Sequence, residues 1–260
     1  MVSQYYFLAS VLPPLAIGQK ADISWETFLF LLETNLKPND WAKATVIRRL
    51  YDLENIRFFW KEEELDPRGN FDELALEEAL LTGDGFPDYV YDFLDKYTSK
   101  EERLRHFSAL IAAYFQSEIA ASQGFLRDYL EFERQLRLIL TGFRAKRMQR
   151  DLSKELQYED PDDDIIAQLL ASRDSKHFEP PEGYEQLKGY FHEGHEDPLA
   201  LYQALFAYRF NWVEERLEVD LFSMDRILGY MVQLIMVLKW MELDQDRGHQ
   251  VIDMMIKEAL

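Results

Sequence analysis

The residues best suited to metal chemistry lie in the segment FHEGHEDP, residues 191–198, where His192 and His195 are three positions apart. Zinc proteases use two histidines four apart on a helix, because that spacing directs both imidazoles at one ion. Here the spacing is three, Gly194 interrupts the segment, and no third ligand is evident. We therefore predict a loop that ends at the N-cap of the next helix, with no metal bound.

Other segments that resemble reactive sites also lack essential residues. The chain has no Cys, so it has no thiolate nucleophile, no disulfide and no Cys-ligated metal. DPDDD, residues 160–164, lacks EF-hand spacing, and its acids favour the start of a helix over IIAQLLA, residues 165–171. LTGDGF, residues 81–86, lacks the ending of a phosphate loop. We predict no catalytic residue, no cofactor and no metal ligand.

The elements around these segments are predicted to be helices. None of the nine prolines falls in residues 88–160 or 199–260, so both regions can hold long helices. Residues 99–123 open with Ser99 and Glu102, which have the spacing of a capping box, and apolar residues then recur at helical intervals. These features predict a helix from the capping box onward.

The same periodicity predicts helices elsewhere, and one apolar run, residues 4–12, is the best strand candidate. The other predicted helices are residues 24–36, 40–60, 125–143, 196–219, 223–244 and 249–260. The predicted loops are residues 61–71, 82–87, 157–163 and 175–198. Residues 223–244 are apolar nearly all round, which predicts a buried helix.

The predicted fold is all-α, a bundle of long helices arranged in two or three similar lobes. We expect an N-terminal helical lobe over residues 1–98 and a long-helix lobe over residues 99–260, unless the chain forms one compact domain. Hydrophobic residues make up 47% of the 260 positions and aromatic residues 14%, which is enough to fill a sizeable core.

The charge and the apolar segments predict a cytoplasmic location. The chain has 29 basic and 48 acidic residues and a net charge of −19, which disfavours nucleic acid and anionic membrane as partners. Residues 1–20 lack a basic leader, and their apolar run is broken by two prolines, so we expect folded protein there. Residues 228–240 are too short to span a bilayer and contain Lys239. Any membrane contact is expected to be peripheral, through partner proteins.

One stretch reverses the charge of the chain. RQLRLILTGFRAKRMQR, residues 134–150, carries six Arg and Lys residues and no acid. The apolar stripe of residues 125–143 continues, in the same steps, to Arg147, Arg150 and Lys154. Since a buried unpaired arginine is costly, either the helix leaves the body here or an acidic surface lies opposite.

These residues leave three interpretations open. Arg144, Arg147 and Arg150 can form a cationic patch that binds an acidic partner surface. They can instead pair within the chain, with an acidic set that follows: Glu155, Asp160 and Asp162–Asp164. A break in the helix at Gly142 would make the stripe argument void.

Two stretches resemble a bacterial family that is encoded among V-type ATPase subunits. QYYFLASVLPPL, residues 4–15, is similar to the start of that family. RRLYDLENIRFFW, residues 48–60, resembles its Asp-x-x-Asn-Leu pattern on a helix, with Asp52, Asn55 and Ile56 here.

Two further stretches resemble the funnel-shaped coupling subunit in the central stalk of V/A-type ATPases. FSMDRILGYMVQLIMVLKW, residues 222–240, is similar to its late apolar helix. FERQLRLILTGFRAKR, residues 132–147, resembles a helix of that protein with a Leu-Arg-x-Lys ending, although the family's Asn is replaced by Arg134 or Gln135. The charged ending of the late helix is also absent, and the resemblances cover about a quarter of the chain.

The resemblance implies a non-catalytic coupling subunit of a V-type ATPase rotor. Such a protein lies on the cytoplasmic face of the membrane rotor ring, receives the tip of the central shaft and transmits torque between them. It implies no cofactor, and its partners are the other components of the ATPase. The alternatives are an assembly factor or interaction protein of the same complex, and an enzyme whose site is built across helices.

Overall fold

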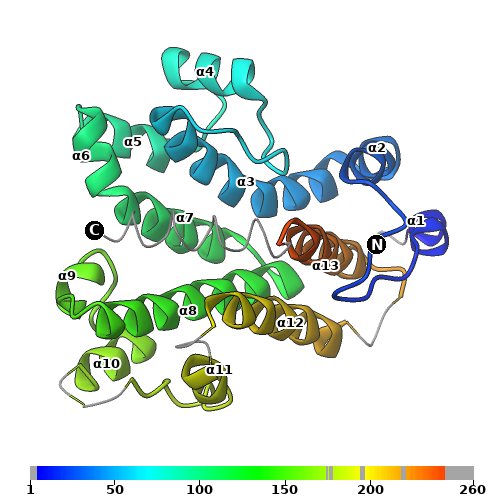
Figure 1. The fold of residues 1–260 in the computed structure, drawn as a ribbon. Coiled ribbons are helices and arrows are strands. Elements are labelled where there is room, and N and C mark those ends of the chain that lie inside the picture. Colours follow the sequence, from blue (N-terminus) through cyan, green and yellow to red (C-terminus); the bar gives the residue numbers. More distant parts are fainter. Residues whose placement is uncertain (1–4, 174, 176–177, 194–196, 218–220, 244–260) are drawn as a thin grey trace. The chain divides into compact units, whose positions relative to one another are not determined.

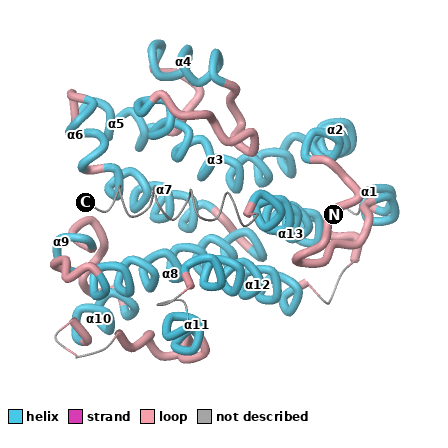
Figure 2. The backbone as a smooth tube through the Cα atoms, viewed as in Figure 1, coloured by secondary structure: helices cyan, strands magenta, loops and turns pink. Residues whose placement is uncertain are grey.

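The computed structural model describes residues 5–173, 175, 178–193, 197–217 and 221–243. These residues form thirteen helices and no strand, which confirms the all-α prediction (Figures 1 and 2). The helices are α1 (Tyr6–Val11), α2 (Trp25–Asn35), α3 (Pro38–Lys61), α4 (Glu73–Thr82), α5 (Asp88–Lys96), α6 (Lys100–Arg105), α7 (Phe107–Ala121), α8 (Gly124–Arg147), α9 (Leu152–Glu155), α10 (Asp164–Ala171), α11 (Leu187–Glu193), α12 (Pro198–Arg216) and α13 (Met224–Glu242).

The described residues fall into two compact units. Unit 1 takes its residues from Met1–Asn35, Gln135–Leu156 and Pro161–Leu260, and unit 2 from Leu36–Arg134 and Gln157–Asp160. The boundary that the sequence suggested, between residues 98 and 99, lies inside unit 2. Helix α8 contributes its first eleven residues to unit 2 and the remainder to unit 1.

The core of unit 1 is built around α13. Its side chains from Ile227 to Val237 are buried without a break, as expected for a helix that is apolar nearly all round. The Tyr230 hydroxyl donates a hydrogen bond to the carbonyl of Pro13 at 2.9 Å, and its ring lies 5.5 Å from that of Phe28 on α2. The N-terminal segment is thereby attached to α13.

Helix α13 also approaches the end of α12 closely. A Cβ placed on Gly229 would lie 1.9 Å from Cδ1 of Leu217, the residue that caps α12. Only a glycine at this position admits the Leu217 side chain, which is itself buried. The packing of α13 on the end of α12 therefore depends on one missing methyl group.

Unit 2 is organised around α3, which packs against α7. Leu53 and Ile56 on α3 are buried, as are Leu110 and Tyr114 on α7. The Tyr114 hydroxyl donates to the carbonyl of Val46 on α3 at 2.9 Å. Helix α3 begins with a proline in its first turn, where the missing N–H has no helical partner to lose.

Three predictions about elements were wrong, and each has a physical reason. Residues 6–11 form a helix and not a strand, since a short apolar run fits either period. Residues 99–123 break at His106, which stacks on Tyr97 at 4.5 Å and hydrogen-bonds the Tyr158 hydroxyl. Helix α11 lies inside the loop expected at residues 175–198. The helix expected over residues 249–260 lies outside the described residues.

Candidate partner-binding surface

The three arginines selected from the sequence lie at the end of α8, and all three are exposed. The helix continues through Gly142 and ends at Arg147, so the break considered at Gly142 does not occur. Phe143 is the last buried aromatic residue of the stripe, and Arg147 lies in solvent. No arginine is buried at this point, so the cost that the sequence raised does not arise.

The helix end is formed by the backbone and suits positive charge. Gln149 has a left-handed φ of 55°, and the Arg150 N–H donates to the carbonyl of Ala145 at 2.8 Å. This arrangement satisfies carbonyls that the last turn leaves free. Those carbonyls carry the negative end of the helix dipole, so the nearby cations stabilise the helix by about 0.3–1 kcal/mol each.

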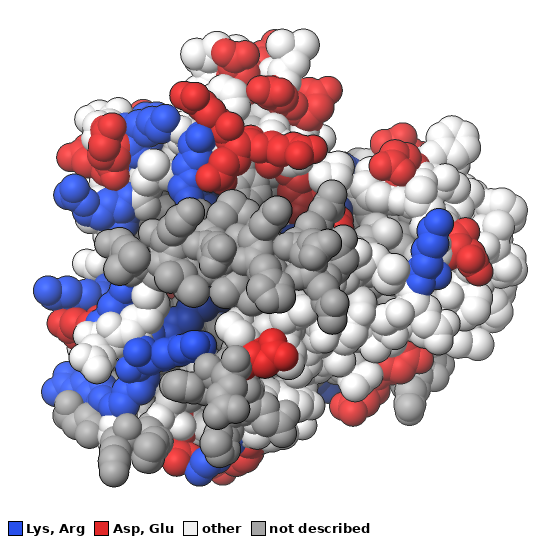
Figure 3. Space-filling view, viewed as in Figure 1, with Lys and Arg blue, Asp and Glu red and all other residues white. Residues whose placement is uncertain are grey.

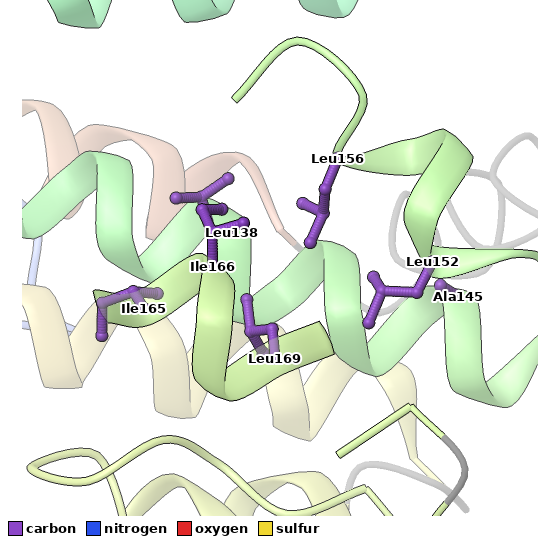
Figure 4. Close-up of a cluster of buried hydrophobic side chains, with 7 residues drawn as sticks. All are labelled: Leu138, Ala145, Leu152, Leu156, Ile165, Ile166 and Leu169. Carbon is purple, nitrogen blue, oxygen red and sulfur yellow. The ribbon is translucent and has the colours of Figure 1, made fainter. Parts of the chain in front are cut away.

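The exposed arginines stand on a hydrophobic base. One face of α8 packs against α9 and α10 through a compact cluster, and Figure 4 shows its side chains directed toward one another. The cluster consists of Leu138, Ala145, Leu152, Leu156, Ile165, Ile166 and Leu169. Gly142 belongs to the same contact, because a Cβ there would lie 2.9 Å from Phe178 and 3.0 Å from Leu169. The base holds the end of α8 in a fixed position.

Further cations surround this end of α8. Lys146 donates to the carbonyl of Arg173 at 2.8 Å, across a pocket of about 270 Å³ that Arg150 also lines. Figure 3 shows Lys and Arg side chains gathered over the end of α8 and α9. Neither Lys146 nor Arg173 was selected from the sequence, because Arg173 comes from beyond the basic run and joins it only through the fold.

The internal pairing is present at one point. Arg150 lies 3.7 Å from Glu155, and both side chains are more than a third exposed, so the pair contributes little to stability. Asp163 accepts hydrogen bonds from the N–H groups of Ile165 and Ile166 and caps α10, as the acids of this segment predicted. Arg147 and Arg150 make further contacts within the chain.

The residues of the Asp-x-x-Asn pattern lie in unit 2 and hold a loop. The Asp52 carboxylate accepts hydrogen bonds from the backbone N–H groups of Asn70 and Phe71 and from the Asn70 side chain. Asn55 forms two hydrogen bonds with the backbone of Asp66. Both side chains are buried, so their role in this structure is to fasten residues 66–71 to α3.

A second buried polar group joins three helices of unit 2. Glu118 on α7 pairs with Arg49 on α3 and accepts a hydrogen bond from the Tyr89 hydroxyl on α5 at 3.0 Å. Burial of the hydroxyl raises the pKa of Tyr89, and the Glu118 carboxylate raises it further. The tyrosine therefore stays protonated and serves as a fixed donor between helices.

The histidine segment remains a prediction. His192 lies on α11, but its side chain and all of His195 lie outside the described part of the structure. Elsewhere along the described ranges, no three His, Asp or Glu side chains gather as ligands for a metal ion. Nor is any helix in those ranges long and apolar enough to cross a bilayer.

Comparison with known proteins shows the family. The family model DUF2764, described as "Protein of unknown function", matches residues 2–259. Proteins from Chlamydia muridarum and Chlamydia trachomatis, both titled "Uncharacterized protein", are each 31% identical over 262 residues, which is 98% of this chain and 98% of each relative. A Chlamydia pneumoniae protein is 29% identical over 258 residues, with 97% of both chains covered. No solved structure matches the chain. Because the family model spans nearly every residue, the chain belongs to the DUF2764 family.

Proposed function

We propose that this protein is a non-catalytic coupling subunit of a V-type ATPase rotor, which links the central shaft to the membrane rotor ring from the cytoplasmic side. The choice of complex rests on the resemblance of residues 222–240 and 132–147 to the coupling subunit of V/A-type ATPases. The choice of contact rests on one observation, the exposed cations at the end of α8 in a chain of net charge −19.

The end of α8 has the properties that a coupling contact needs. Its 24 residues form a helix about 36 Å long, and the cluster around Leu169 fixes one end of it. Arg144, Arg147 and Arg150 present charge from a rigid base, so little side-chain and backbone order is lost when an acidic surface binds. Charge complementarity of this kind selects the partner and its orientation more than it adds affinity.

The proposal is tested by native co-purification. The tagged chain is isolated with the V-type ATPase from membranes of the native organism, and the intact complex is weighed by native mass spectrometry. A coupling subunit remains in the finished complex at a fixed stoichiometry. An assembly factor is found in incomplete complexes only, and an unrelated protein is found in neither.

The contact is tested by charge reversal. Arg144→Glu combined with Arg147→Glu should release the chain from the rotor at a lower salt concentration than the wild type. The matched control is Lys20→Glu combined with Lys100→Glu, which reverses two exposed cations elsewhere and should leave binding unchanged. Retained binding of the arginine variant would exclude α8 as the contact.

The internal interpretation makes a separate forecast. If the acids that follow are the true partners, Arg150→Glu should destabilise the free chain, and Glu155→Arg should restore it. Because the pair is exposed and 3.7 Å apart, we expect a change in the free energy of unfolding below about 1 kcal/mol.

A further inference from the structure

Helix α4 exposes an apolar stripe on its outer face. Leu74 and Leu81 are 76% and 79% exposed, more than any other large apolar side chain in the described ranges. They are seven residues apart and so lie on the same face of the helix, while Leu76 and Ala79 on the other face are buried. Glu77 and Glu78 flank the stripe on the helix surface. A soluble surface gains nothing by exposing two leucines in line.

A pocket of about 400 Å³ adjoins this stripe within unit 2. It is lined by Trp60, Leu80, Leu81, Thr82, Gly83, Tyr91, Leu94, Asp95 and Arg103. The guanidinium of Arg103 donates to the carbonyls of Leu94 and Tyr97 and lies 5.6 Å from the ring of Trp60. Since that cation is already bonded, the pocket offers mainly aromatic and aliphatic surface to an occupant. Its volume is sufficient for one or two large apolar side chains.

The surroundings of the pocket carry most of the negative charge of the chain. Residues 62–95 contain twelve acidic residues and one basic residue, Arg68, so their formal charge is −11 out of −19 for the whole chain. Arg68 is buried and pairs with Asp66, so it does not offset the exposed acids. Figure 3 shows Asp and Glu side chains gathered over α4. An anionic ligand would be repelled from this pocket.

We propose that the α4 groove, defined as Leu74, Leu81 and the adjoining pocket, binds a basic amphipathic helix of a partner protein. An apolar side chain of the partner enters the pocket between Trp60 and Leu81, and Leu74 extends the contact along α4. Lysine or arginine residues beside that side chain face Glu77 and Glu78. Helices bind apolar grooves in this way through side chains spaced three, four and seven residues apart.

The groove is tested with a peptide probe and the full-length chain. The probe is a fluorescein-labelled peptide of about 14 residues, built only of Leu and Lys, with leucines on one helical face and a length of about 20 Å as a helix. A second peptide has the same composition in a scrambled order. Fluorescence anisotropy should show binding of the first peptide that weakens as salt rises, and binding of the second that is at least about tenfold weaker.

Variants then locate the bound probe. Leu74→Ser combined with Leu81→Ser should weaken binding about tenfold or more, because the apolar contact is lost. The matched control is Phe30→Ser on α2, which removes another exposed side chain (63%) and should have no effect. Glu78→Lys should weaken binding and reduce its salt dependence, whereas Glu33→Lys should not. Since these side chains are exposed, the melting temperature should be unchanged.

The tryptophan in the pocket gives an independent measurement. The probe contains no Trp, so an unlabelled version should change the emission of the chain's own tryptophans when it binds. That change should disappear in Trp60→Phe, which leaves the other four tryptophans in place.

Three results would overturn the proposal. The scrambled peptide binds as tightly as the ordered one, which indicates charge attraction alone. The Phe30 variant loses as much affinity as the leucine variant. The wild-type chain self-associates in sedimentation while the leucine variant is monomeric, in which case the occupant is a second copy of this chain. The groove lies in unit 2 and the arginines of α8 lie in unit 1, so the peptide measurement and the rotor co-purification can fail separately.

Discussion

The side chain of Asn55 forms a closed pair of hydrogen bonds with the backbone of Asp66. Its Nδ2 donates to the Asp66 carbonyl at 2.9 Å, and its Oδ1 accepts from the Asp66 N–H at 2.8 Å. An amide side chain is the one group that can match both backbone atoms of a residue at once. The loop after α3 is therefore held by a residue of the helix in the way that a neighbouring strand would hold it.

Replacing Asn55 with Ala should destabilise the protein by about 3 kcal/mol, because two backbone groups of the loop lose their partner in a buried site. Asn39→Ala, an exposed change on the same helix, should alter stability by less than about 0.5 kcal/mol. Urea unfolding of the two variants measures the difference. Equal effects would show that the loop is held by other contacts.

Two glycines should respond in opposite directions to alanine. A Cβ on Gly69 would lie 2.6 Å from Oδ1 of Asp52 and 2.8 Å from Nδ2 of Asn55, so Gly69→Ala should cost about 1–3 kcal/mol. Gly189 on α11 has no atom within 4 Å of its added Cβ, and Gly189→Ala should stabilise the helix by about 1 kcal/mol. Thermal unfolding that moves in the same direction for both would contradict the packing described.

The contact between Gly229 and Leu217 should appear as a coupling in a double-mutant cycle. Gly229→Ala should cost about 1–3 kcal/mol in the wild type, because its Cβ overlaps the Leu217 side chain. In a Leu217→Ala background the obstructing atoms are absent, so the same change should cost much less. Effects that add to within about 0.5 kcal/mol would place the two residues out of contact.

Alkaline stability should depend on Tyr184, whose hydroxyl donates to Oε1 of Gln135 at 2.6 Å. Burial raises its pKa to about 12, above the ordinary value of 10.0. The folded state therefore favours the protonated form, and the resulting stabilisation is full below pH 10 and is lost as pH rises toward 12. Urea unfolding at pH 8, 10 and 11 should show a steeper loss for the wild type than for Tyr184→Phe. Parallel curves would mean that the hydroxyl is not buried as described.

Local signals in the sequence predicted the helices whose termini are made by neighbouring residues. Ser99 and Glu102 form the capping box that their spacing indicates, and Asp163 caps α10. The break at His106 was not predictable, since it depends on rings that lie far along the chain, chiefly Tyr158. Nor did the periodicity distinguish helix from strand in the six residues of α1, which are too few to separate the two patterns.

The candidate surfaces were predictable to different degrees. The arginines of α8 were visible in the sequence because they lie within one basic run, and the structure places them at a single helix end. The α4 groove was missed. Its acids were counted only in the total charge, and the exposure of Leu74 and Leu81 depends on which face of α4 meets the rest of unit 2. Exposure of a helix face is set by tertiary packing, which the spacing of two leucines does not specify.

Helix α8 has a consequence for how the protein unfolds. Residues Gly124–Arg134 are packed by unit 2, and the remaining thirteen residues by unit 1. A helix segment of about 12 residues is marginal in water without tertiary packing. If either unit opened alone, half of α8 would lose its support and the other half would fray from the new end. The two units therefore share a free-energy cost of opening, and amide hydrogen exchange along α8 should follow the slower of the two rather than divide at Arg134.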